Sequence, residues 1–256
     1  MKACKVFCVY FGPKRGSVSC SPDGPLKTLE LFKYILDTDS NTDPGVESLD
    51  TIIVHNVFEG DIPKECLDFL NEVNDTKTDW GSITVLDRHE RLGASLGAYS
   101  YAYDHFEGQY DYWFFCEDDI RVYRPGYYQL AVNEFEEDPK LGFLALTNIN
   151  FESDFRRKHV SGGFGIANRE SLEKVKDKFG FLPYDKSGGG YGQFGTSEQL
   201  FTNCFIRLDY NVRIPNNLNF VPLADNWIDF SPQRVWQSKN KLDIKDKNFF
   251  YHIGLK

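Results

Sequence analysis

Short runs of consecutive apolar residues alternate, over the first half of the chain, with segments whose apolar residues recur every three or four positions. The runs predict buried β-strands and the spaced segments predict amphipathic helices. A strand–helix alternation that reaches a fourth strand is typical of a parallel sheet with helices on both faces. The predicted strands are 4–11, 51–57, 82–86 and a run that begins at Tyr110, separated by helices over 26–36, 63–73 and 92–106.

The second half gives weaker signals of the same kinds. Helices are predicted over 125–137, 169–178 and 196–208, and strands over 141–146 and within 160–167. Residues 187–195 are rich in glycine and predict either a mobile lid or a plain flexible loop. A chain of 256 residues with no interdomain linker predicts one large α/β unit with an appended C-terminal part.

Composition narrows the class of protein. The net charge of −9 argues against a nucleic-acid partner, because nucleic-acid binders carry basic surfaces. No apolar stretch reaches the 18 residues or so of a transmembrane helix, and a first strand starting at Cys4 leaves no room for a signal peptide. The six cysteines lack metal-ligand spacing, so we expect a reduced, cytoplasmic protein.

Three carboxylates, Glu117, Asp118 and Asp119, follow the fourth predicted strand with no spacer. In open α/β sheets ligands bind beyond the carboxyl ends of the strands, which is where these acids fall. Adjacent carboxylates held against a core repel one another and need a cation, and hard oxygen ligands suit Mg²⁺ or Mn²⁺ shared with substrate phosphates. The alternative is a solvated acidic turn.

Basic and glycine-rich segments are further candidates. Arg88, His89 and Arg91 follow the third strand and either hold a phosphate or form a solvated turn. Gly162-Gly163 predicts a close backbone approach, by substrate or within a bulge. Residues 190–195 match GxGxxG, but no clear strand precedes them and no acid follows at the required distance, so a dinucleotide site is rejected.

Several residues late in the chain each allow two interpretations, one functional and one structural. Glu198 is either functional or a first-turn acid favoured by the helix N-terminus. His252 lies in an apolar terminal run, where a packed histidine is the ordinary alternative to a metal ligand. Tyr191 and Trp227 either stack on a sugar face or pack within the protein.

The stretch Phe114-Phe115-Cys116-Glu117-Asp118-Asp119-Ile120 resembles the "DXD" signature of GT-A-fold glycosyltransferases. The Glu-Asp-Asp form is similar to that of the Golgi N-acetylglucosaminyltransferases that use UDP-GlcNAc. The resemblance extends to 124–128, to Arg91, to the Gly162-Gly163 turn, to Glu198 and to a C-terminal histidine. The run Ser197-Glu198-Gln199 departs from the family's x-Glu-Asp pattern because it lacks the second acid.

The resemblance implies a nucleotide-sugar-binding half over 1–120 and an acceptor-binding, catalytic half over 121–256. It implies that Asp119 ligates Mn²⁺ or Mg²⁺ with His252, and that Glu198 is the base of an inverting transfer from a UDP- or GDP-linked sugar to a glycan or other hydroxyl acceptor. It assigns the remaining contacts as follows: donor, Tyr10, Phe11, Gly12, Asn56, Arg91, Glu117 and Asp118; acceptor, Gly163, Tyr191 and Trp227.

Two other functions fit the same residues. A sugar-1-phosphate nucleotidyltransferase is also α/β with acid-held Mg²⁺, and residues 12–16 faintly suggest its glycine-rich basic loop. A non-catalytic GT-A-like domain would bind a glycan or a nucleotide without transferring sugar.

Overall fold

The computed structural model describes eleven stretches of the chain: 1–12, 24–57, 60–90, 92–118, 121–122, 125–145, 149–150, 159–160, 165–184, 193–213 and 228–229. For 121–122, 149–150, 159–160, 193–199, 213 and 228–229 it describes the backbone alone.

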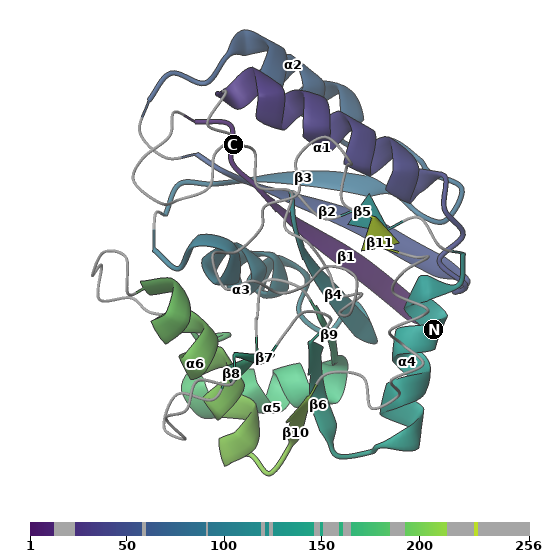
Figure 1. Ribbon diagram of the computed structural model, residues 1–256, viewed down its shortest axis with the longest axis vertical. Coiled ribbons are helices and arrows are strands. Elements are labelled where there is room, and N and C mark those ends of the chain that lie inside the picture. The colour runs from purple at the N-terminus through teal and green to yellow at the C-terminus, as the bar shows by residue number, and fades with distance from the viewer. Residues whose placement is uncertain are drawn as a thin grey trace.

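A seven-stranded sheet crosses the molecule in the order β10-β6-β9-β4-β1-β2-β3 (Figure 1). β1 to β4 run parallel to one another, β9 is inserted antiparallel between β4 and β6, and β10 is parallel to β6. The prediction of a mostly parallel sheet is confirmed. The strands of this sheet are β1 (Lys2–Val9), β2 (Ser48–Asn56), β3 (Ile83–Arg88), β4 (Tyr112–Glu117), β6 (Leu141–Ala145), β9 (Gly165–Asn168) and β10 (Asn211–Arg213).

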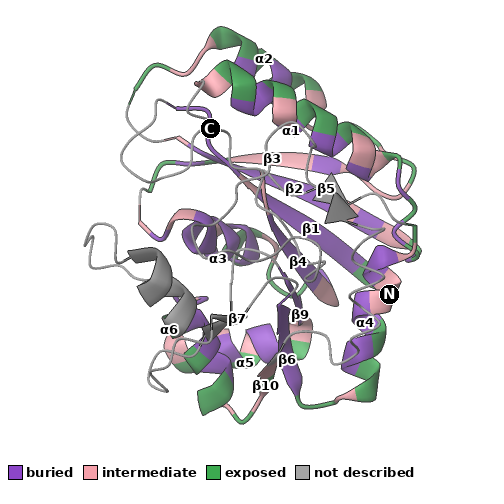
Figure 2. Ribbon diagram, viewed as in Figure 1, coloured by how far each residue is buried: buried purple, intermediate pink, exposed green. Residues whose placement is uncertain are grey.

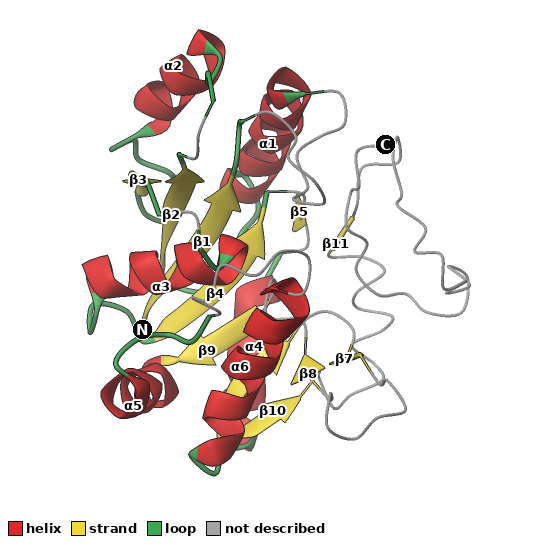
Figure 3. Ribbon diagram, turned by 90° about the vertical axis from the view of Figure 1, so that its left-hand side faces the viewer, coloured by secondary structure: helices red, strands yellow, loops and turns green. Residues whose placement is uncertain are grey.

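Helices cover both faces of the sheet, as the alternating pattern predicts (Figure 3). Those on one face are α1 (Pro25–Ser40), α2 (Lys64–Val73) and α4 (Tyr127–Glu137), and those on the other are α3 (Ala94–Phe106), α5 (Arg169–Phe179) and α6 (Gln193–Arg207). The central strands are buried, whereas the outward sides of α1 and α2 are exposed (Figure 2). Two cores therefore lie back to back across one sheet.

β4 shows why an unbroken apolar run occupies the centre. Trp113 and Phe115 pack into the core beneath α3, and Phe114 and Cys116 pack into the core beneath α1 and α4. All four side chains are fully buried, because the pleat sends alternate residues to opposite faces and both faces are covered.

Local sequence explains several helix ends. Pro25 stands at the start of α1, where a missing N–H costs nothing. The side chain of Asn168 caps α5 by accepting a hydrogen bond from the Ser171 N–H at 2.9 Å, and Gly180 ends α5 with a φ of 82°.

The glycine-loop prediction over 187–195 is corrected at its end, because α6 already begins at Gln193. In the sequence Phe194 stands seven positions before Phe201, so the helical period reaches back through Gly195. Residues 185–192 lie outside the described stretches.

Two short strand pairs lie beside the main sheet. β7 (Ile149–Asn150) pairs with β8 (His159–Val160), and β5 (Arg121–Val122) pairs antiparallel with β11 (Ile228–Asp229). Figure 3 shows β5 and β11 side by side at the edge where the acidic run leaves β4. Among the described residues no helix is long and apolar enough to cross a membrane.

Candidate functional site

The acidic run begins at the carboxyl end of the sheet, as predicted. Glu117 is the last residue of β4 and lies opposite Cys8 of β1 in the parallel ladder. The backbone N–H of Tyr10, just past the end of β1, donates to Asp118 Oδ2 at 3.3 Å. The two acids are partly exposed. The start of the acid turn is therefore hydrogen-bonded to the segment that follows β1.

A row of polar side chains crosses the ends of three neighbouring strands. Arg88 Nη1, at the end of β3, donates to Asn56 Oδ1 at 2.9 Å, and Asn56 Nδ2, at the end of β2, donates to Cys8 Sγ of β1 at 3.0 Å. The same alternation places Glu117 of β4 on this face, next in line. We name Arg88, Asn56, Cys8 and Glu117 the edge row.

Arg88 is only 1% exposed, although it ends a strand. Its Nη2 donates to the Leu92 carbonyl, and its guanidinium lies 3.7 Å from the carboxylate of Glu90. A Cβ at Gly97 would lie 2.5 Å from Arg88 Nη2, so the first turn of α3 accepts this guanidinium because residue 97 is glycine.

Tyr184 closes the outer side of this arrangement. Its hydroxyl donates to Glu90 Oε2 at 3.2 Å, and Arg88 Cζ lies 6.0 Å from the centre of its ring. A Cβ at Gly93, where φ is 81°, would meet that ring at 2.3 Å. Arg88 and Tyr184 therefore both contact Glu90 and the start of α3.

Burial, assisted by neighbouring carboxylates, keeps the Cys8 thiol protonated. Burial raises the pKa of Cys8 well above its ordinary value, and the carboxylates of Asp118 and Glu117 raise it further. The Arg88 charge and the Asn56 hydrogen bond oppose this shift without overcoming it. Cys8 is therefore a neutral hydrogen-bonding group at the site and not a nucleophile.

The opposite face of the same edge carries a second polar pair. His55 Nδ1 lies 2.9 Å from Asp87 Oδ1, and the His55 ring packs 5.7 Å from that of Phe11. His55 is fully buried, and burial lowers its pKa, with Asp87 acting in the opposite direction. Within the described residues His55 Nε2 has no hydrogen-bond partner. The imidazole is therefore neutral at pH 7.

The residues predicted to contact the donor at the ends of β1 and β2 do not all lie on one face of the sheet. Asn56 belongs to the edge row, whereas Phe11 is fully buried in the other core beside Phe32. Tyr10 is nearly buried, and a Cβ at Gly12 would lie 2.4 Å from its hydroxyl. Tyr10 and Gly12 are thus adjacent at the acid turn, while the Phe11 ring packs away from Asn56.

Glu198 lies in α6, six positions along a helix that starts at Gln193. The interpretation of Glu198 as an acid of the first turn is therefore wrong, since α6 has none there. Only the backbone is described at this position. Its catalytic role stays a prediction.

The other predicted site residues lie outside the described stretches: Arg91, Asp119, Gly163, Tyr191, Trp227 and His252. Gly165, at the end of the same glycine run as Gly163, is explained by packing, because a Cβ there would lie 2.5 Å from Phe143 Cζ. The pairing of Asp229 with Arg121 brings residues 228–229 beside residues 121–122, which follow the acid turn in the sequence.

Sequence reasoning named Arg88 but left open a solvated turn. That alternative is wrong for Arg88, which is buried, while His89 is exposed. Cys8 was overlooked as a site residue. Strand alternation was the available signal, because Cys4, Val6 and Cys8 occupy one face of β1.

The described carboxylates are compatible with a hard divalent cation. Among the described residues no group of three His, Cys, Asp or Glu side chains could enclose a metal ion. Mg²⁺ and Mn²⁺ in such sites keep several waters and need only one or two carboxylates plus substrate phosphates. Glu117 and Asp118 supply oxygen ligands of the required chemistry, and both are partly exposed.

Comparison with known proteins places the fold. Neither a protein-family model nor a curated protein sequence matches the chain. A mannosyltransferase from Pyrobaculum calidifontis, solved with GDP-mannose and Mn²⁺, aligns over 85% of this chain at 15% identity, with a TM-score of 0.51. The chain has a GT-A-like fold.

The alignment covers 55% of the mannosyltransferase, so this chain spans about half its length. A CMP:2-keto-3-deoxy-manno-octonic acid synthetase solved with CTP is a more distant match, at 13% identity over 84% of this chain and 89% of its own, with a TM-score of 0.47. At 15% identity the likeness to the mannosyltransferase is one of fold alone.

Proposed function

We propose that the protein is a divalent-metal-dependent glycosyltransferase that moves a sugar from a nucleoside-diphosphate sugar to a hydroxyl acceptor, with inversion at the anomeric carbon. The observation that carries this proposal is the acid turn. Glu117, the acidic member of the edge row, and Asp118, which accepts from the Tyr10 N–H, lie at the carboxyl end of β4, where open α/β sheets bind ligands. The GT-A-like fold and the Glu-Asp-Asp sequence support it.

In this proposal the ends of β1 and β2 hold the nucleotide. Tyr10, Gly12 and Asn56 contact the base and ribose, and Glu117 or Asp118 reaches the ribose or the waters of the metal. Asp119 and His252 hold Mn²⁺ or Mg²⁺, which when bound neutralises charge on the departing nucleoside diphosphate.

Glu198 accepts the proton of the acceptor hydroxyl as that oxygen attacks the anomeric carbon. Gly163, Tyr191 and Trp227 form the acceptor contacts. The strand pair β5–β11 supports a contribution of the C-terminal half, because it holds residue 228, the neighbour of Trp227, close to the exit of the acid turn.

The test is a panel of UDP- and GDP-sugars measured by thermal shift and by donor hydrolysis, with Mn²⁺ and with EDTA. A transferase binds one donor more tightly with Mn²⁺ and slowly releases UDP or GDP. Asp119→Asn should abolish the gain from Mn²⁺, and Glu137→Gln, an exposed acid at the far end of α4, is the matched control.

Two outcomes contradict the proposal. Release of pyrophosphate from a nucleoside triphosphate and a sugar phosphate identifies a nucleotidyltransferase. Binding of a nucleotide or glycan that does not depend on Mn²⁺, with no turnover, identifies a binding domain.

A further inference from the structure

The hydrogen bonds of the edge row all run in one direction, from Arg88 to Asn56 and from Asn56 to Cys8, and the sequence alone does not show this. Arginine has hydrogen-bond donors and no acceptor, so Arg88 must face the oxygen of the Asn56 amide, and the Asn56 NH₂ group must then face Cys8. The orientation of this amide, which is ordinarily ambiguous, is fixed by its neighbour. Arg88 thereby turns the Asn56 NH₂ group toward Cys8 and the acidic end of the row.

We propose that Arg88 is a positioning residue that orients the Asn56 amide and the start of α3, and thereby sets the affinity of the site for a nucleotide. The inference rests on the proposed function for its ligand. Its structural part, the orientation of Asn56, is independent of any activity.

The hydrogen bond between Arg88 and Asn56 is buried and not at the protein surface. Arg88 and Asn56 are 1% and 2% exposed, and a buried guanidinium must be hydrogen-bonded to be tolerated. Within the described residues its Nε has no partner, and its carboxylate neighbour Glu90 is half exposed and 3.7 Å away. Arg88 thus links groups from the ends of β2 and β3 with the start of α3 in a buried position, which favours a role in arranging the site.

The same guanidinium also contacts the start of α3. One arm donates to the Leu92 carbonyl and the other to Asn56, so the end of β2 and the start of α3 are joined through a single rigid group. Lysine cannot make both contacts, because its ammonium is a point charge on a flexible stem. The planar fork is therefore the property to be tested.

The experiment compares Arg88→Met, Arg88→Lys and Asn56→Leu with the double variant Asn56→Leu/Arg88→Met. For each, donor KM, kcat and melting temperature are measured with Mn²⁺. We expect Arg88→Met to raise the donor KM about tenfold or more while kcat changes little, since a lost charge-assisted hydrogen bond weakens binding by that order. Arg88→Lys should recover melting temperature more than KM, and the double variant should raise the donor KM by less than the two single effects combined.

The matched control is Lys5→Met/Asp39→Leu, which removes the buried charges of the other core. A second readout needs no activity: exchange of the Asn56 side-chain amide protons, followed in ¹⁵N-asparagine-labelled protein. We expect slow exchange in the wild type and the control, and fast exchange in Arg88→Met.

Three results would overturn the proposal. They are an unchanged donor KM in Arg88 variants of lowered melting temperature, additive effects of Asn56→Leu and Arg88→Met, and unchanged amide exchange. Failure of the proposed function looks different, because the wild type then shows no Mn²⁺-dependent donor binding while the exchange difference persists.

Discussion

At the scale of single residues, His55 gives the protein a defined pH response. Burial lowers its pKa below the ordinary value of 6.5, so in mildly acidic solution the unfolded chain binds a proton that the native protein does not. The free energy of unfolding therefore has its full value above about pH 6.5 and decreases as the pH falls toward the pKa of His55 in the native protein. Urea unfolding at pH 7 and pH 5 should show a smaller loss for His55→Gln than for the wild type.

The control for this measurement is His105→Gln, since His105 is exposed on α3. If His55→Gln keeps the full pH dependence of the wild type, the imidazole is not the group that titrates.

Glu198 also belongs to this scale, because its sixth position in α6 leaves no capping role to account for it. If Glu198 is the base, Glu198→Gln should lower turnover by roughly 10²- to 10⁴-fold while Mn²⁺-dependent donor binding survives. Steady-state transfer assays and donor calorimetry measure the two quantities separately. Near-normal turnover would move the role to Asp225 or to Asp229, and the latter lies in β11 opposite Arg121.

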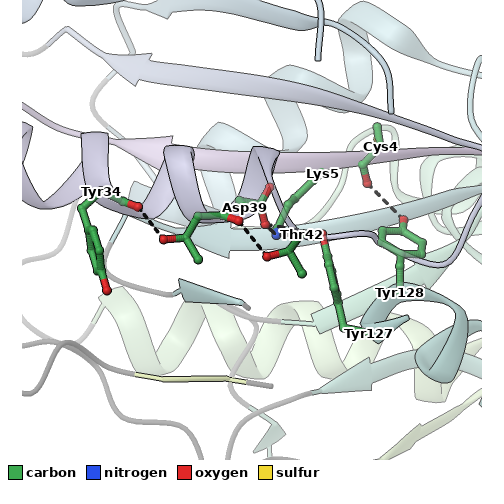
Figure 4. Close-up of polar contacts among 8 residues, drawn as sticks. Cys4, Lys5, Tyr34, Asp39, Thr42, Tyr127 and Tyr128 are labelled. Carbon is green, nitrogen blue, oxygen red and sulfur yellow. Dashed lines mark hydrogen bonds and ion pairs between the residues drawn. The ribbon is translucent and has the colours of Figure 1, made fainter. Parts of the chain in front are cut away.

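At the scale of elements, a buried ion pair joins β1, α1 and α4. Lys5 Nζ pairs with Asp39 and donates to the Tyr127 hydroxyl at 3.2 Å, with both charged groups almost fully buried (Figure 4). The neighbouring Gly126 N–H donates to the Asp43 carbonyl at 2.8 Å. The beginning of α4 is thus fixed against the end of α1, and with it the far end of the segment that leaves the acid turn.

Removing one member of this pair should cost far more than removing both. Lys5→Met leaves Asp39 buried without its cation and should lower the free energy of unfolding by about 3–5 kcal/mol. Lys5→Met/Asp39→Leu should recover most of that loss, because no charge then remains in the core. Urea titrations with a fixed m-value test both. Equal losses in the single and double variants would show that the pair is net stabilising.

The same buried groups mark the limit of prediction from sequence. Strands and helices with long apolar runs or clear spacing, such as β4 and α3, follow from local pattern. Arg88 and Lys5 do not, because the groups that make their burial possible lie 32 and 34 residues away. The antiparallel insertion of β9 is equally non-local: four residues carry too little pattern to specify two partners.

At the scale of the whole molecule, the sheet is assembled from both halves of the chain. β1 to β4 supply the acid turn and edge row, and β6, β9 and β10 extend the same sheet beyond β4. The division into a nucleotide half over 1–120 and an acceptor half over 121–256 stays a prediction. The pairing of β5 with β11 brings residues 228 and 229 back to residues 121 and 122, just after the acid turn.

That return is the basis for assigning the C-terminal tail to the site. His252 lies 23 positions after Asp229, outside the described residues, and a neutral imidazole is a competent Mn²⁺ ligand. If His252 completes the shell begun by Asp119, His252→Ala should raise the Mn²⁺ concentration needed for half-maximal turnover while the melting temperature without metal stays unchanged. Because imidazole binds a proton near pH 6.5, the wild type should also need more Mn²⁺ at pH 6 than at pH 7.5, and His252→Ala should lose part of that difference. A variant with a lower melting temperature and an unaltered Mn²⁺ requirement would make His252 a packing residue and the tail a structural element.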